Sequence, residues 1–160
     1  MLRVVDGTVF FLVVIVFDLI GLVQSPEGVT ADGLLPDQLF APGIGAALAF
    51  SIAAFMGFES GAIYSEETRN PRRTVARATY TAVGIIAVFY AFSAWALSVG
   101  IGPSAIVDAA RESGPDLVFV WLAEQSPLLA HVANVLFITS LLAALVAFHN
   151  GAARYFFALG

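Results

Sequence analysis

Apolar residues fall in four long runs that are separated by three more polar segments. Each run holds about 20 residues, the length at which an α-helix that rises 1.5 Å per residue crosses a hydrocarbon core of about 30 Å. The pattern therefore predicts four transmembrane helices, which we place at residues 7–24, 41–64, 80–101 and 128–148. The fold class that follows is an all-α integral membrane protein.

The polar segments differ in charge, and the difference predicts the orientation of the chain. The first segment contains Glu27, Asp32 and Asp37 but no arginine, whereas the second, "SEETRNPRRTVARAT", contains four arginines. Arginine-rich loops stay in the cytoplasm. With four spans, both termini then face the cytoplasm, and we expect a multi-pass protein of the cell membrane.

The third polar segment, residues 104–125, repeats apolar positions at helical spacing. This spacing predicts one or two short surface helices, with Trp121 placed at a membrane interface. In the second segment, Pro71 is expected to stop the preceding helix and to hold Asn70 in an extended conformation. Taken alone, "EETRNPRR" is typical of a solvated loop that fixes topology.

Composition excludes several classes of protein. The chain is 59% hydrophobic and 12% charged, whereas soluble domains are roughly 25% charged. Cysteine is absent, which excludes disulfides, thiolate nucleophiles and cysteine metal sites. His131 and His149 lack metal-ligand spacing with a second histidine or a carboxylate, so structural roles are favoured. We expect no metal, cofactor, nucleic-acid partner or enzymatic activity.

The second apolar run contains a carboxylate, Glu59, between Gly57 and Gly61. The glycines favour local unwinding of the helix, and a broken helix in a membrane needs a cavity lined by protein. A charged group at bilayer depth is costly unless it faces such a cavity, where it can exchange a proton. The alternative is a neutral, hydrogen-bonded structural glutamate.

Asp18, in the first run, has two possible roles: a buried hydrogen-bonding group, or part of a polar face towards further helices. Other residues of the runs are expected to pack. The aromatic packing residues are Phe55, Phe58, Phe89, Tyr90 and Phe92. Small residues on one helical face, which suit close helix contacts, are Gly84, Ala87 and Ala91.

The stretch "AFMGFESGAIYSEETRNPRRTVARA", residues 54–78, resembles the sixth transmembrane segment and following loop of the amino acid/polyamine/organocation (APC) permease superfamily. "HNGAARYFFALG" is similar to the inner end of its eighth segment. The resemblance covers nearly the whole chain, and the first run corresponds to segment five. Two positions depart from the family's pattern: Ala53 stands where several relatives have a gating aromatic, and Ala76 replaces a proline.

The resemblance implies a LeuT-like fold of two inverted repeats, in which residues 1–160 form a partial permease domain and the remaining helices are partners. It implies that substrate is bound at Ala54, Phe55, Met56, Gly57, Phe58 and Ser60. It also implies that Glu59 couples protonation to transport. The inner loop motif comprises Glu66, Glu67, Asn70, Pro71, Arg72, Arg73 and Arg77.

The predicted function is that of a fragment of a secondary active transporter which moves amino acids or related amines, coupled to protons. Thr139 and Ser140 could instead contribute oxygens to a sodium site. One alternative is a self-sufficient four-helix exporter or accessory subunit acting as an oligomer, with Glu59 at a symmetric interface. A second alternative, a membrane enzyme that uses Glu59 and a histidine, finds no support in the residue spacing.

Overall fold

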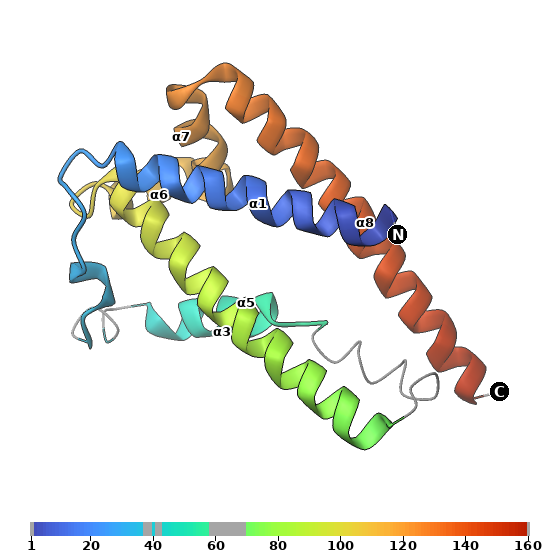
Figure 1. Cartoon of the computed structure of the whole chain (residues 1–160). Helices are drawn as coiled ribbons and strands as arrows, with labels where there is room; N and C mark the ends of the chain where they lie inside the picture. Colours follow the sequence, from blue (N-terminus) through green and yellow to red (C-terminus); the bar gives the residue numbers. More distant parts are fainter. Residues whose placement is uncertain (1, 37–39, 41–42, 58–69, 160) are drawn as a thin grey trace. The chain divides into compact units, whose positions relative to one another are not determined.

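The computed structural model describes residues 2–36, 40, 43–57 and 70–159 (Figure 1). These residues form helices joined by turns, and no strand occurs among them, which confirms the all-α class. The α-helices are α1 (Leu2–Val23), α3 (Ile44–Ala54), α5 (Pro71–Ile101), α6 (Ile106–Ser113), α7 (Leu117–Gln125) and α8 (Pro127–Leu159). Two short 3₁₀ helices are η1 (Asp32–Leu34) and η3 (Gly114–Asp116).

The chain divides into two compact units. The first unit comprises Met1–Leu39 and Ala91–Thr139, and the second comprises Phe40–Tyr90 and Ser140–Gly160. Helices α5 and α8 are therefore each divided between the two units.

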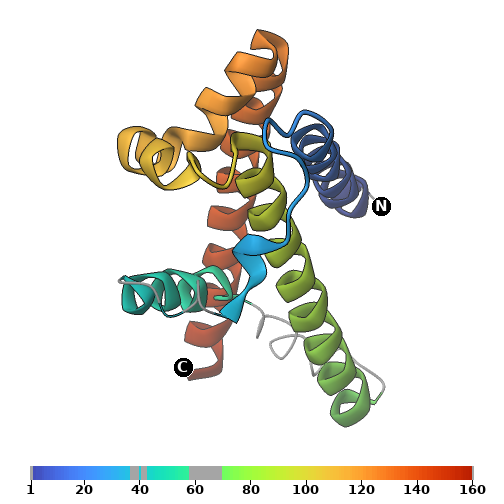
Figure 2. The same cartoon turned by 90° about the vertical axis from the view of Figure 1, so that its left-hand side faces the viewer.

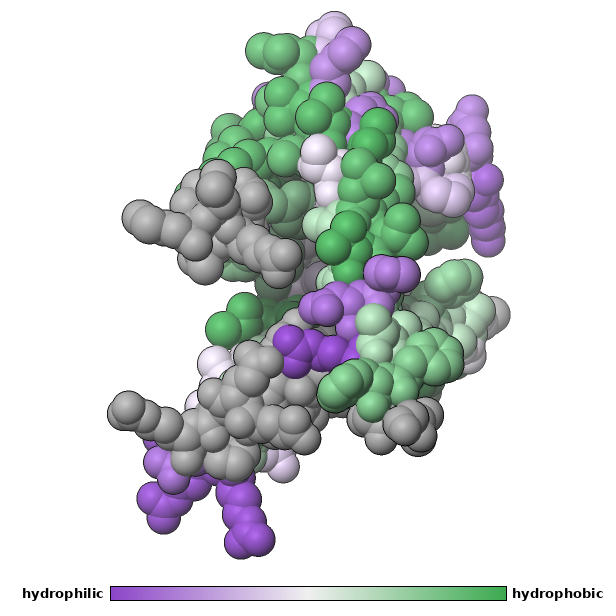
Figure 3. Space-filling view, turned by 90° about the vertical axis from the view of Figure 1, so that its right-hand side faces the viewer, coloured by the Kyte–Doolittle hydropathy of each residue, from purple (hydrophilic) through white to green (hydrophobic). Residues whose placement is uncertain are grey.

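Two helices of the described residues are long and apolar enough to cross a membrane: Arg72–Ile101 and Pro127–Phe157. With 31 and 33 residues, α5 and α8 are about 46 and 50 Å long. Thr8–Val23 and Ile44–Ala54 are shorter apolar helices. The four expected spans thus remain a prediction. Apolar side chains are exposed on the face drawn in Figure 3.

Helix α5 begins earlier than the span expected at residue 80. Its first residue is Pro71, and the Asn70 carbonyl accepts a hydrogen bond of 3.0 Å from the Thr74 amide. Proline suits the first helical position because its missing N–H has no partner there and its fixed φ is helical. Pro71 thus starts α5. Its expected role in stopping the preceding helix stays a prediction, because residues 58–69 lie outside the described residues.

The C-terminal ends of α1 and α5 lie side by side in the first unit (Figures 1 and 2). A Cβ atom on Gly100 would lie 2.8 Å from Gly21 Cα and 3.1 Å from Trp121 Cζ2. The absence of side chains at the two glycines thus allows the backbones to touch, with the Trp121 ring covering the contact. Around it lies a buried cluster that comprises Trp121, Leu122, Ala130 and Ala133.

The loop after α1, residues 24–31, is hydrogen-bonded to residues at the C-terminal end of α5 and just after it. The Trp95 indole N–H donates to the Thr30 carbonyl at 2.8 Å, and the Ser104 hydroxyl donates to the Glu27 carboxylate. Gly102 has φ +108°, and a Cβ atom there would lie 2.8 Å from Glu27 Oε1. Only glycine fits this close approach without strain.

The third polar segment forms two short α-helices, α6 and α7, as expected. Val118, Val120 and Glu124 of α7 are exposed, as expected of a surface helix. The Trp121 side chain, which was expected to face a membrane interface, is instead only 6% exposed and packs inside the first unit. The packing role expected of Gly84, Ala87 and Ala91 is also not seen among the described residues. Ala87 and Ala91 are exposed, and a Cβ atom on Gly84 would contact nothing within 4 Å.

Candidate functional site

The helix of the second apolar run ends just before Gly57, one of the two glycines that were expected to unwind it. Helix α3 ends at Ala54, and residues 55–57 form a turn. The Phe55 and Met56 amides donate to Ile52 and Ala53 carbonyls, both at 3.1 Å, in the tight i→i−3 pattern that often ends helices. Gly57 has φ +100°, a left-handed conformation that glycine adopts without steric cost. The unwinding expected at Gly57 is confirmed, and that expected at Gly61 lies outside the described residues.

Side chains from α5 and α8 contact this turn within the second unit. The Tyr90 hydroxyl donates to the Ala54 carbonyl at 3.4 Å, and the Tyr90 ring meets Phe55 edge to face with centroids 5.9 Å apart. A Cβ atom on Gly57 would lie 3.9 Å from the Phe148 ring. Ala54 and Met56 are exposed, and Phe55 is half-buried.

The chemistry of the turn follows from the end of the helix. Carbonyls at a helix C-terminus carry partial negative charge, and those of Ile52, Ala53 and Ala54, which each accept one hydrogen bond here, keep a second lone pair. They can accept hydrogen bonds from an ammonium group, and the faces of Phe55 and Tyr90 can attract the same cation. The turn is thus suited to one end of an amino acid or amine.

Several predicted site residues lie outside the described residues. These are Phe58, Glu59, Ser60, Glu66 and Glu67. The coupling role of Glu59 therefore stays a prediction. Of the inner loop motif, Asn70 precedes α5 and is exposed, while Arg72, Arg73 and Arg77 lie exposed in its first two turns.

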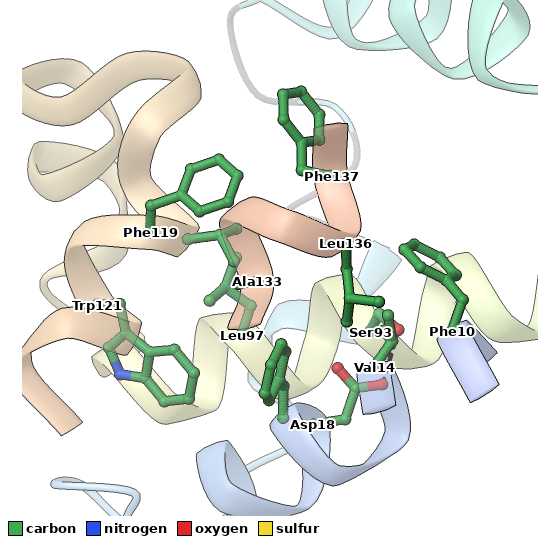
Figure 4. A pocket seen from close by; sticks show the side chains of 12 residues that line it. Phe10, Val14, Asp18, Ser93, Leu97, Phe119, Trp121, Ala133, Leu136 and Phe137 are labelled. Atoms are coloured by element: carbon green, nitrogen blue, oxygen red, sulfur yellow. Dashed lines mark hydrogen bonds between the residues drawn. The ribbon is translucent and has the colours of Figure 1, made fainter. Parts of the chain in front are cut away.

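A second polar feature lies within the first unit, where Asp18 of α1 meets Ser93 of α5. The Ser93 hydroxyl donates to Asp18 Oδ2 at 2.7 Å, and Asp18 is only 7% exposed. Of the two roles considered for Asp18, its burial and its bond to Ser93 favour that of a buried hydrogen-bonding group. The pair lines a cavity of about 220 Å³ between α1, α5, α7 and α8 (Figure 4).

Ser93, Gly21 and Gly100 were not among the residues predicted from the sequence. A hydroxyl within an otherwise apolar run was the available signal for Ser93. Nothing in the spacing pairs it with Asp18, because 75 residues separate the two. From the sequence, Gly21 and Gly100 could be identified only as small residues. Their contact with each other arises because α1 and α5 meet at these positions.

Three polar side chains of α8 bond to carbonyl groups of their own helix. His131 Nδ1 lies 2.7 Å from the Pro127 carbonyl oxygen, and the Asn134 amide donates to the Ala130 carbonyl at 2.9 Å. The Thr139 hydroxyl lies 3.0 Å from the carbonyl oxygens of both Val135 and Leu136. In the part of the chain that the structure describes, no group of three metal-ligating side chains occurs.

Comparison with known families decides the classification. The family model described as amino acid permease matches residues 5–160. The chain belongs to the amino acid permease family. No curated protein and no solved structure matches it. Membership of a transporter family agrees with the prediction that this permease chain is not an enzyme, and it makes the apolar helices α5 and α8 those of a membrane protein.

Proposed function

We propose that the chain forms part of a secondary active transporter for amino acids or related amines, and that the turn after α3 holds the substrate. The observation that carries the proposal is the end of the apolar helix α3 at Ala54 and the turn through Gly57, in a member of the amino acid permease family. Broken helices at mid-membrane depth present free backbone groups, and these bind charged ends of substrates in transporters.

Substrate would contact the residues that the resemblance indicates. Ala54, Phe55, Met56 and Gly57 form the turn itself, and Phe58 and Ser60 follow it. Tyr90 supports the geometry because its hydroxyl bonds to the Ala54 carbonyl while its ring packs on Phe55. The turn thereby keeps its position while Met56 stays exposed to a ligand.

Transport is proposed to be coupled to protons through Glu59, two residues beyond Gly57. Replacing Glu59→Gln keeps the size of the side chain but removes its titration. Uptake of substrate by the full-length protein in proteoliposomes should then lose its dependence on external pH, while substrate binding persists. The matched control is Glu67→Gln, a loop carboxylate whose replacement should leave the pH profile unchanged. An unchanged profile in Glu59→Gln would show that coupling resides elsewhere.

The chain is proposed to act with further helices. None of the described residues in the second unit, which carries the turn, is buried, so its polar backbone has little cover from the chain itself. The purified 160-residue chain in liposomes should therefore accumulate no amino acid. Measured uptake by this chain alone would contradict the proposal and favour a self-sufficient carrier.

The proposed orientation places both termini in the cytoplasm. Because the chain has no cysteine, single cysteines at Asp32 and Thr74 can be labelled without background. A membrane-impermeant maleimide applied to intact cells should label the cysteine at position 32 and spare the one at position 74 until the membrane is opened. Labelling of both from outside would overturn the orientation.

A further inference from the structure

The Asp18 carboxylate has unused capacity to bind. It is the one ionisable side chain among the residues that line the cavity in the first unit. Within the described residues its partner is the Ser93 hydroxyl, although a carboxylate can accept about four hydrogen bonds. Burial disfavours the charged form of a carboxyl group unless a partner of opposite sign lies beside it. A cation bound in the cavity would supply that partner and use the remaining lone pairs of Asp18.

The rest of the cavity is aromatic. Its lining includes Phe10, Phe17, Phe119, Trp121 and Phe137. Phe119 and Phe137 meet edge to face with centroids 5.4 Å apart. Figure 4 shows Asp18 and Ser93 next to each other, with these two rings farther away across the cavity. Aromatic rings attract an organic cation with their faces and its apolar body through contact area.

The size of the cavity limits what can enter. Its volume is about 220 Å³, and an apolar cavity of about 150 Å³ already admits benzene. One aromatic ring with a short aminoalkyl chain therefore fits. The ammonium group would reach Asp18, and the ring would lie among the phenylalanines.

We propose that this cavity is a second binding site, which takes a small protonated amine with one aromatic or similarly bulky apolar group. Asp18 pairs with the ammonium group, and Ser93 orients the carboxylate by its hydrogen bond. The site is built from α1, α5, α7 and α8 of the first unit and uses no residue of the turn after α3. It therefore does not depend on the function proposed for that turn.

The first test compares two probes of the same shape on the purified full-length protein in lipid nanodiscs. The probes are 2-phenylethylamine and 2-phenylethanol, in which a neutral hydroxyl replaces the ammonium group. Calorimetric titration, with empty nanodiscs as the blank, should show the amine binding at least about tenfold more tightly, as expected for a buried charge pair. Equal affinities, or binding of neither probe, would overturn the proposal.

Variants then locate the site. Asp18→Asn keeps the size of the side chain and its hydrogen bond from Ser93 but removes the charge, so the affinity for the amine should fall to that for the alcohol. Ser93→Ala keeps the charge and should change the affinity for the amine much less. Persistent tight binding of the amine to Asp18→Asn would exclude Asp18 as its partner.

A cavity-filling variant separates this site from the turn after α3. Ala133 lines the cavity and is 7% exposed, so Ala133→Phe should abolish binding of both probes. Ala87→Phe, at an exposed position of α5, is the matched control and should bind them like the original protein. Retained amine binding in a folded Ala133→Phe variant would place the ligand elsewhere.

Discussion

The two units of the chain differ in how far they stabilise themselves. Every buried side chain among the described residues belongs to the first unit, including the Trp121 cluster and Asp18. The second unit has none, although its helices are equally apolar, and its large side chains such as Phe156 are exposed. The proposed substrate turn lies in this second unit. The first unit is thus packed by the chain itself, whereas the chain leaves the side chains of the second unit partly or fully exposed.

The largest expected effect comes from emptying the core of the first unit. Trp121→Ala should lower the free energy of unfolding by about 3–5 kcal/mol, because a large buried ring leaves a cavity. Phe148→Ala removes a ring that is 58% exposed in the second unit and should change the stability by about 0.5 kcal/mol or less. Denaturant unfolding in mixed micelles, followed by circular dichroism, measures both. Equal losses would break the comparison, since they would mean that Phe148 is packed as tightly as Trp121.

Two glycines of α5 allow a second comparison of packing in the two units, because Gly100 lies in the first unit and Gly84 in the second. Gly100→Ala should cost about 1–3 kcal/mol through overpacking, because the added Cβ would meet the backbone of Gly21 at 2.8 Å. Gly84→Ala in the second unit meets no atom within 4 Å and should raise stability by up to about 1 kcal/mol through helix propensity. The same unfolding measurement should give opposite signs. A loss at Gly84 would reveal a neighbour that the chain itself does not supply.

The smallest effects concern one side-chain hydrogen bond in each unit. Ser104→Ala removes the donor to Glu27 and should cost about 1 kcal/mol. Tyr90→Phe removes an exposed bond of 3.4 Å to the Ala54 carbonyl and should cost about 0.5 kcal/mol or less. Hydrogen exchange should speed up in residues 24–31 for Ser104→Ala and change little around residue 54 for Tyr90→Phe. A larger loss at Tyr90 would mean that the turn after α3 depends on this bond.

Some features of the site were predictable because their cause lies within a few neighbouring residues. The ending of α3 before Gly57 follows from the conformational freedom of glycine, and the helical class follows from the apolar runs. Pro71 shows the limit of local reasoning. Proline both ends one helix and suits the first position of the next, and only the backbone hydrogen bond from Thr74 to Asn70 identifies it as the start of α5.

The sequence by itself determined the apolar and helical character of the chain, the unwinding at Gly57 and the resemblance to permeases, because apolar run length and glycine preferences act locally. Only the tertiary structure paired Asp18 with Ser93, brought Gly21 against Gly100 and turned Trp121 inward. These contacts join residues that are far apart in the chain, and helix spacing does not say which face of one helix meets which face of another. The aromatic cavity beside Asp18 exists because four helices meet there.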